Sequence, residues 1–188
     1  MARVCLYKGD WQNALVAAKA VIEKHGALED LTTSKVLPNY YKSVESIVAL
    51  EQVMTSSYVR IGSPNKALID KYRTGDKRKS LFYKAITASA YTLQKYGEKG
   101  NDGYRCSFRS GEAYLIAAEA AAELAADNAA ASDSKLNEAR TYLKELMVKR
   151  YASAKYNQYA AQLDDMQKAD LLKAIFNERA YELAFEGH

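Results

Sequence analysis

The sequence predicts a mainly α-helical protein, with helical hairpins at both ends and a small irregular insert of short strands between them. Apolar residues recur at the helical spacing i, i+3, i+4, i+7 near the start of the chain and again from residue 107 onward. Between these regions the helical spacing is lost, and β-branched residues and turn-forming glycines take its place. The 188 residues are enough for one well-cored domain, which we divide into residues 1–30, 31–106 and 107–188.

Residues 1–30 predict a helical hairpin. A helix through about Tyr7 ends at Gly9, Asp10 caps the next helix, and Gly26 ends it. The apolar face of the second helix contains Trp11, Ala14, Leu15, Ala18, Val21 and Ile22. The spacing of this segment, with small alanines where helices approach closely, resembles the turn and second helix of a tetratricopeptide-type hairpin. We expect Trp11 to pack in the core.

Residues 31–106 predict the insert. Residues 45–53 form a strand, Pro64 opens a short helix at its favoured first position, and residues 80–89 and 90–96 are extended segments or short strands. The basic run Lys77-Arg78-Lys79 predicts a solvated turn. Residues 97–103 form a flexible loop that lacks the spacing of calcium ligands.

Residues 107–188 predict further hairpins. Ser110 or Ser107 caps a helix that runs to about Asp127, and a second helix follows over residues 136–147. Residues 151–159 form a tyrosine-rich connection that is itself compatible with a helix. The last helix begins between residues 164 and 170 and still reads as helix at the end of the chain.

The final helix contains charged residues within its apolar stripes. Glu178 and Glu182 share a stripe with leucine, isoleucine and phenylalanine, and Arg179 and Glu186 share the neighbouring one. Stranding a buried charge without a partner costs several kcal/mol, so these side chains require an ion-pair network. We expect Arg179 to reach Glu182 or Glu186, and other helices to supply the remaining partners.

Composition excludes several functions. A net charge of +4 without an aromatic-interleaved basic stripe disfavours nucleic-acid binding. Cys5 and Cys106 do not make a disulfide framework, and we expect Cys5 to be a small buried hydrophobe. His25 and His188 are not in any metal-binding motif, so we predict no metal and no cofactor. No run of apolar residues is long enough for a membrane span.

Several motifs resemble the SusD/RagB family, in the order in which that family has them. Residues 107–124 resemble its arginine, glutamate and AEA helix, with Arg109 and Glu112 matching, and Leu136-Asn137 with Arg140 resembles its LN-x-x-R helix. ERAYELAFEGH, residues 178–188, resembles its terminal motif and is the most specific match. Further points of similarity are residues 6–15, 45–52, Pro64, Leu68, Tyr72, Asp76, Arg78 and Lys95-Tyr96.

The resemblance implies a SusD-like helical fold and a function in nutrient capture. Members are surface-exposed lipoproteins of the outer membrane that bind glycans or other nutrients and pass them to a TonB-dependent, SusC-like transporter, without catalysis. Because the chain lacks the family's first helical repeat and its lipoprotein leader, we expect a truncated form without the lipid anchor, in which Cys5 is not acylated. We expect the matched charges Arg109, Glu112, Glu178, Arg179, Glu182 and Glu186 to form buried ion-pair networks that fix how the hairpins stack.

Ligand residues do not follow from the shared motifs, because the family places them mostly in irregular loops. Tyrosine supplies most of the aromatic surface, with 15 tyrosines against four phenylalanines and one tryptophan. An aromatic ring stacks on the apolar face of a sugar, and charged or amide groups bind its hydroxyl groups. Within the insert, Tyr58, Arg60 and Tyr83 are therefore the candidate ligand-binding residues.

Two other classes of function are open. The chain could be a tetratricopeptide-type module that binds a protein partner in a groove, although about two and a half hairpins would be few for a solenoid. It could also be a glycoside hydrolase using Glu178 and Glu182 as paired carboxylates, although their apolar helix face argues against this.

Overall fold

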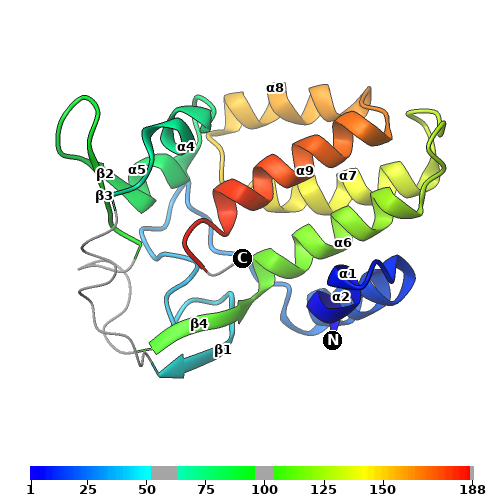
Figure 1. Ribbon diagram of the computed structural model, residues 1–188, viewed down its shortest axis with the longest axis horizontal. Helices are drawn as coiled ribbons and strands as arrows, with labels where there is room; N and C mark the ends of the chain where they lie inside the picture. Colours follow the sequence, from blue (N-terminus) through cyan, green and yellow to red (C-terminus); the bar gives the residue numbers. More distant parts are fainter. Residues whose placement is uncertain (52–62, 96–103, 187–188) are drawn as a thin grey trace.

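The computed structural model describes residues 1–51, 63–95 and 104–186, and in this part the protein is mostly helical, as predicted. Figure 1 shows the long helices gathered on one side, the insert on the other, and the C-terminal turn between them. The helical side comprises α1 (Ala2–Tyr7), α2 (Trp11–His25), α6 (Ser110–Leu124), α7 (Ser134–Met147), α8 (Ser153–Asp164) and α9 (Lys168–Glu182). The insert comprises β1 (Ser46–Glu51), α4 (Lys66–Lys71), α5 (Lys77–Phe82), β2 (Tyr83–Ala85), β3 (Tyr91–Leu93) and β4 (Tyr104–Arg109).

The hairpin of α1 and α2 forms as predicted. Gly9 takes the left-handed conformation, with φ of 71°, and Asp10 caps α2 by accepting a hydrogen bond from the backbone N–H of Asn13. Trp11 is half-buried and packs against the helical core, and Cys5 is buried as a free thiol. The apolar spacing therefore placed this hairpin correctly.

Helix α6 forms the centre of the helical core. Its alanines at 117, 118, 120, 121 and 122 are fully buried, and the helix packs against α2, α7 and α9. Such small side chains let helices approach closely. The predicted serine cap is wrong, because Arg109 occupies the N-cap position and makes no side-chain cap. Ser110 is the first helical residue, and its hydroxyl group donates to the backbone carbonyl of His25 instead.

The remaining helices follow the predicted order. Asp133 caps α7 by accepting from the backbone N–H groups of Lys135 and Leu136, and the tyrosine-rich connection does become helix α8. The prediction that α9 continues to the end of the chain is wrong. Helix α9 ends at Glu182, and Phe185 takes a φ of 64° in the turn that follows.

The insert contains two small antiparallel pairings, β1 with β4 and β2 with β3. The predicted strand at 45–53 is confirmed over Ser46–Glu51. Its first residue, Glu45, lies in the preceding turn, and residues 52–53 lie outside the described part. Residues 80–82 belong to α5 and not to a strand. The prediction that Pro64 is the first residue of this helix is wrong. Asn65 is the N-cap of α4, where its side chain accepts a 2.8 Å hydrogen bond from the N–H of Ala67, so Pro64 lies before the helix.

The largest error concerns the basic run at 77–79. These residues form the first turn of α5 and not a solvated turn, and the Arg78 side chain is completely buried. The reason is that Asp76 caps α5 and turns Arg78 inward, where several carboxylates bind it.

Two apolar clusters build the interior. The helical cluster joins α1, α2, α6, α7 and α9. The insert cluster contains Leu37, Ile69, Tyr72, Phe82, Tyr83 and Leu93, together with Tyr181 from α9. Among the described residues, no helix is both long enough and apolar enough to cross a membrane.

Candidate functional site

Charged side chains fill the space between the two apolar clusters. We call this set the charged junction, and it consists of Glu45, Asp76, Arg78, Lys95, Arg109, Arg150, Glu178, Glu182 and Glu186. Its members come from the insert, from the connection after α7, and from the last turns of α9 with the turn that follows. Charged groups at this depth require direct partners, and every member has at least one.

Glu182 lies at the centre of the charged junction and is fully buried. One of its oxygens accepts from Arg109 at 2.7 Å and from Arg150 at 2.9 Å, and the other accepts from Arg78 at 3.0 Å. Burial alone would raise the pKa of this carboxyl group, but the guanidinium groups of Arg150 and Arg109 outweigh burial and hold the pKa well below its ordinary value.

Arg78 connects α5 to α9. Its guanidinium group donates to both oxygens of Asp76, the shortest distance being 2.7 Å, and to Glu178 at 2.6 Å. The hydroxyl group of Tyr151 donates to the second oxygen of Glu178 at 2.5 Å. Burial raises the pKa of Glu178, whereas Arg78 opposes this rise. The two glutamates on α9 therefore differ in their electrostatic surroundings.

Lys95 and Arg109 hold the turn after α9. The ammonium group of Lys95 donates to the backbone carbonyls of Glu182 and Ala184, each at 2.9 Å, and contacts Glu186 at 2.5 Å. Arg109 donates to the carbonyl of Glu182 and to both oxygens of Glu186. Both donors bind the carbonyl of Glu182, the last residue of α9, which has no partner within the helix. Burial lowers the pKa of Lys95.

The opposite side of the charged junction is closed by Glu45. Its carboxylate accepts from Arg150 at 2.6 Å and from Arg109 at 2.9 Å. The start of α6 lies directly against these groups. A Cβ atom at Gly111 would stand 2.6 Å from Nη1 of Arg109 and 2.9 Å from Oε2 of Glu45, so any side chain here would require these bound groups to shift.

Two of the predicted ion pairs have different partners from those expected. Glu112 binds Arg3 of α1 and not Arg109, with a closest distance of 2.5 Å. Arg179 binds Glu119 of α6 at 2.6 Å and does not bind Glu182 or Glu186. The reason is that Arg179 lies on the side of α9 that faces α6, whereas the other charges face the insert.

The predicted ligand residues are placed only in part. Tyr58 and Arg60 lie outside the described residues, so their role stays a prediction. Tyr83 lies in β2 with 4% of its surface exposed, and its ring packs edge-on against Tyr72 and Phe185. Its hydroxyl group is 3.1 Å from that of Tyr72. This position serves the insert cluster, and the proposal that Tyr83 also binds a ligand stays untested.

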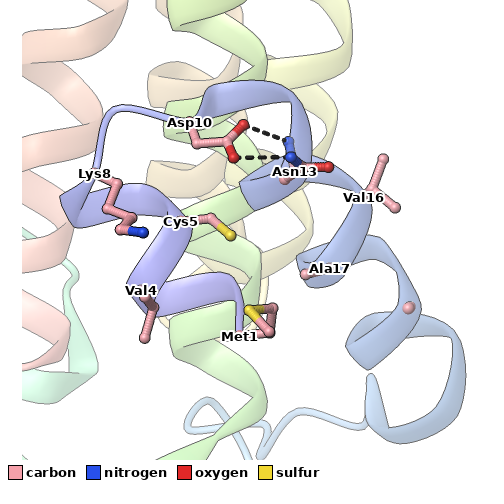
Figure 2. A pocket seen from close by; sticks show the side chains of 9 residues that line it. Met1, Val4, Cys5, Lys8, Asp10, Asn13, Val16 and Ala17 are labelled. Atoms are coloured by element: carbon pink, nitrogen blue, oxygen red, sulfur yellow. Dashed lines mark hydrogen bonds between the residues drawn. The ribbon is translucent and has the colours of Figure 1, made fainter.

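An open pocket of about 510 Å³ lies at the other end of the molecule, between α1 and α2. Figure 2 shows Met1, Val4 and Cys5 on one side of this pocket and Val16 and Ala17 on the other. Its polar groups are Lys8 and the pair Asp10 and Asn13, whose side chains bind each other at 2.8 Å. A mainly apolar lining with few available polar groups does not match a sugar site, and Tyr83, the one predicted ligand residue within the described part, does not line it.

Neither metal chemistry nor paired-carboxylate chemistry finds a site in the described part of the chain. No group of three or more possible metal ligands occurs there. Glu178 and Glu182 are 3% and 0% exposed and are bound by arginine, so a substrate could not reach them in this structure. The hydrolase alternative raised by their spacing therefore has no support from their placement.

Helical hairpins that meet a small insert through a buried charged junction define a scaffold of the SusD-like class. The sequence matches the SusD family over residues 9–188, which is nearly its whole length. The chain belongs to this family. A search of the curated proteins finds no match.

Solved structures show the same fold. A SusD-like carbohydrate binding protein from Bacteroides vulgatus is 21% identical with a TM-score of 0.68, and the match covers 99% of this chain and 41% of the other. A SusD superfamily protein from the same species is 19% identical with a TM-score of 0.74, covering 100% and 45%. One from Bacteroides thetaiotaomicron is 17% identical with a TM-score of 0.69, covering 99% and 45%. The chain thus spans less than half the length of these three relatives.

Proposed function

We propose that this chain is part of a non-catalytic protein that binds glycans or related nutrients for a TonB-dependent uptake system. The observation that carries the proposal is the family match over residues 9–188. A structural relative described as a carbohydrate binding protein supports a sugar as the ligand. In this proposal the whole protein is held at the outer-membrane surface by a lipid anchor and passes its ligand to a SusC-like transporter.

The arrangement of the described residues suits a binding protein. The helical cluster and the charged junction form a packed support, and the candidate ligand residues Tyr58 and Arg60 belong to the insert in sequence. Loops on a rigid scaffold are common places for binding residues. The sealed position of Glu178 and Glu182 supports binding without hydrolysis.

Affinity electrophoresis of the 188-residue chain tests the glycan part. Native gels would contain amylopectin, a mixed-linkage β-glucan, an α-mannan or a pectin, and calorimetry would follow with oligosaccharides of any polymer that retards the chain. We expect retardation by at least one polymer and no release of reducing sugar. A folded chain that no polymer retards, or one that binds peptides instead, would contradict the proposal and favour a protein-interaction module.

Matched tyrosine variants locate the site. Tyr58→Ala should weaken glycan binding about tenfold, because one aromatic contact contributes up to about 1.5 kcal/mol. Tyr7→Ala is the control, since Tyr7 is an exposed tyrosine on α1. Equal affinities for the two variants would exclude Tyr58 from the site. The transporter part is tested separately, by co-purification of the lipidated parent protein with outer-membrane proteins.

A further inference from the structure

The charged junction has an unequal number of positive and negative groups. Within the described residues it contains four cations, Arg78, Lys95, Arg109 and Arg150, and five carboxyl groups, Glu45, Asp76, Glu178, Glu182 and Glu186. All are buried, and with their ordinary charges they would leave one negative charge in excess. Glu29 lies beside them, where Ser43 and the N–H of Val44 bind its carboxylate, and it only adds to the excess. Proteins rarely keep such a charge uncompensated, and a buried carboxyl group then takes up a proton.

The contacts show which carboxyl group receives the least positive charge. Glu182 contacts three arginines, whereas Glu45 and Glu186 each contact two cations. Both carboxylate oxygens of Asp76 accept from the guanidinium group of Arg78, and one of them also accepts from the backbone N–H of Arg78. Glu178 contacts a single cation, the Nη2 atom of Arg78, and that same atom also binds Asp76 at 2.7 Å. The excess negative charge therefore concentrates at Glu178.

The other groups around Glu178 do not compensate for this shortage. Asp76 approaches from the cap of α5, and Tyr151 approaches from the connection after α7. On α9 itself, Tyr181 and Glu182 also face Arg78: Glu182 accepts from Arg78, and the Arg78 guanidinium group lies over the ring of Tyr181. The cations of the neighbouring elements are bound elsewhere, since Arg150 binds Glu182 and Glu45, and Arg179 binds Glu119 of α6. Burial also raises the pKa of Glu178, in agreement with the geometry.

We propose that Glu178 is a proton-binding site of the folded protein and that its proton balances the charge of the junction. When Glu178 is protonated, its hydrogen bond with Tyr151 reverses, so that the carboxyl group donates and the oxygen of the Tyr151 hydroxyl group accepts. A carboxyl group that binds a proton more tightly when folded stabilises the fold as the pH decreases toward the ordinary glutamate pKa. This stabilisation disappears as the pH rises through the pKa of the folded state. The junction therefore joins the insert to α9 more firmly in mildly acid than in alkaline solution.

Glu178→Gln tests this inference, because glutamine has the shape of a protonated glutamate at every pH. We expect wild type and variant to have equal melting temperatures at pH 5. Between pH 5 and pH 8 the melting temperature of the wild type should fall progressively below that of the variant. The matched control is Glu182→Gln on the same helix, which should melt far below wild type over the whole range, because it leaves three arginines without their shared carboxylate.

Infrared spectroscopy gives a second measurement. As the pH rises above the ordinary glutamate pKa, the wild type should retain the carbonyl band of a protonated carboxyl group, and this band should be missing in Glu178→Gln and shifted in Tyr151→Phe. A Gln variant that melts below wild type by the same amount at every pH, or that fails to fold at pH 5, would overturn the inference. Absence of the protonated carboxyl band from wild type would overturn it as well.

Discussion

The two halves of α9 are held in the protein by different forces. Leu171, Ala174 and Ile175 in its first half are buried and belong to the helical cluster. Glu178 and Glu182 in its second half are equally buried but bind arginines from three other elements. One helix thus joins an apolar core at one end and an ionic one at the other.

The difference shows what each kind of contact contributes. Apolar packing is roughly proportional to area and has little directionality, so it gives stability but fixes position loosely. Ion pairs inside a protein add little net stability, yet each oxygen requires a donor in one place. We infer that the first half of α9 anchors the helix and that the second half fixes the insert in one orientation. Single substitutions in each half test this division.

The largest effect is expected from Arg78→Ala. This change leaves Asp76, Glu178 and Glu182 without their shared cation, and removing one partner of a buried pair destabilises by about 3–5 kcal/mol. Urea unfolding followed by circular dichroism measures the loss. Lys79→Ala, one residue further along the same helix, is the control and should change stability by less than about 0.5 kcal/mol. Similar losses in both variants would mean that α5, and not the ionic contact, is responsible.

Leu115→Ala should produce the next largest effect, in the apolar region. Leu115 is fully buried in α6, and such truncations cost about 2–5 kcal/mol through lost burial and the cavity that remains. Urea unfolding at low and at high salt should give the same loss, because no charge is involved. Val16→Ala, at an exposed position of α2, is the matched control and should be nearly neutral. A loss of stability in Leu115→Ala that depended strongly on salt would contradict the division between an apolar and an ionic region.

Acid should weaken the ionic half of α9 first. The pKa values of Glu182 and Glu186 are lowered because nearby cations outweigh burial, so their contribution is complete above about pH 4.5 and is lost as the pH falls through their folded pKa values. Between pH 5 and pH 2, the near-ultraviolet signal of Tyr151 and Tyr181, which lie beside the charged junction, should disappear before the helical far-ultraviolet signal. Simultaneous loss of both signals would show that the two regions unfold as one unit.

The smallest effect is expected for Arg179 and Glu119. This pair lies at the edge of the helical core, with both side chains partly exposed, and such pairs contribute about 0.2–1 kcal/mol. A double-mutant cycle with Arg179→Ala and Glu119→Ala isolates the coupling energy, which should decrease in high salt. A coupling as large as the loss in Arg78→Ala would place this pair among the buried contacts.

Local patterns were enough to predict most of the helices. The caps at Asp10 and Gly26 and the alanine-rich face of α6 are short-range signals, and they identified these helices correctly. The charged stripes of α9 also indicated a buried ionic network. What local patterns could not supply was the identity of the partners, because Arg78 lies 100 positions from Glu178 and Glu45 lies 64 from Arg109.

The error at Arg78 shows why such partners are missed. A run of three basic residues normally indicates solvent, and only the central one is buried here. The aspartate two residues before Arg78 was an available signal, because a capping carboxylate beside an arginine can share its charge inside the protein. The prediction of where the last helix ends was wrong for a related reason. Helix α9 stops where Lys95 and Arg109, both distant in sequence, bind the carbonyl of its last residue, Glu182.

Gly111 should reveal the charged junction in a mutational scan, because substitutions at this glycine disturb the ions around it. The space that a side chain would occupy at this position already contains the guanidinium of Arg109 and the carboxylates of Glu45 and Glu182. A substitution at residue 111, alanine included, should therefore displace these bound groups and be selected against. A library screen would thus detect an ionic cluster at a residue that carries neither charge nor side chain.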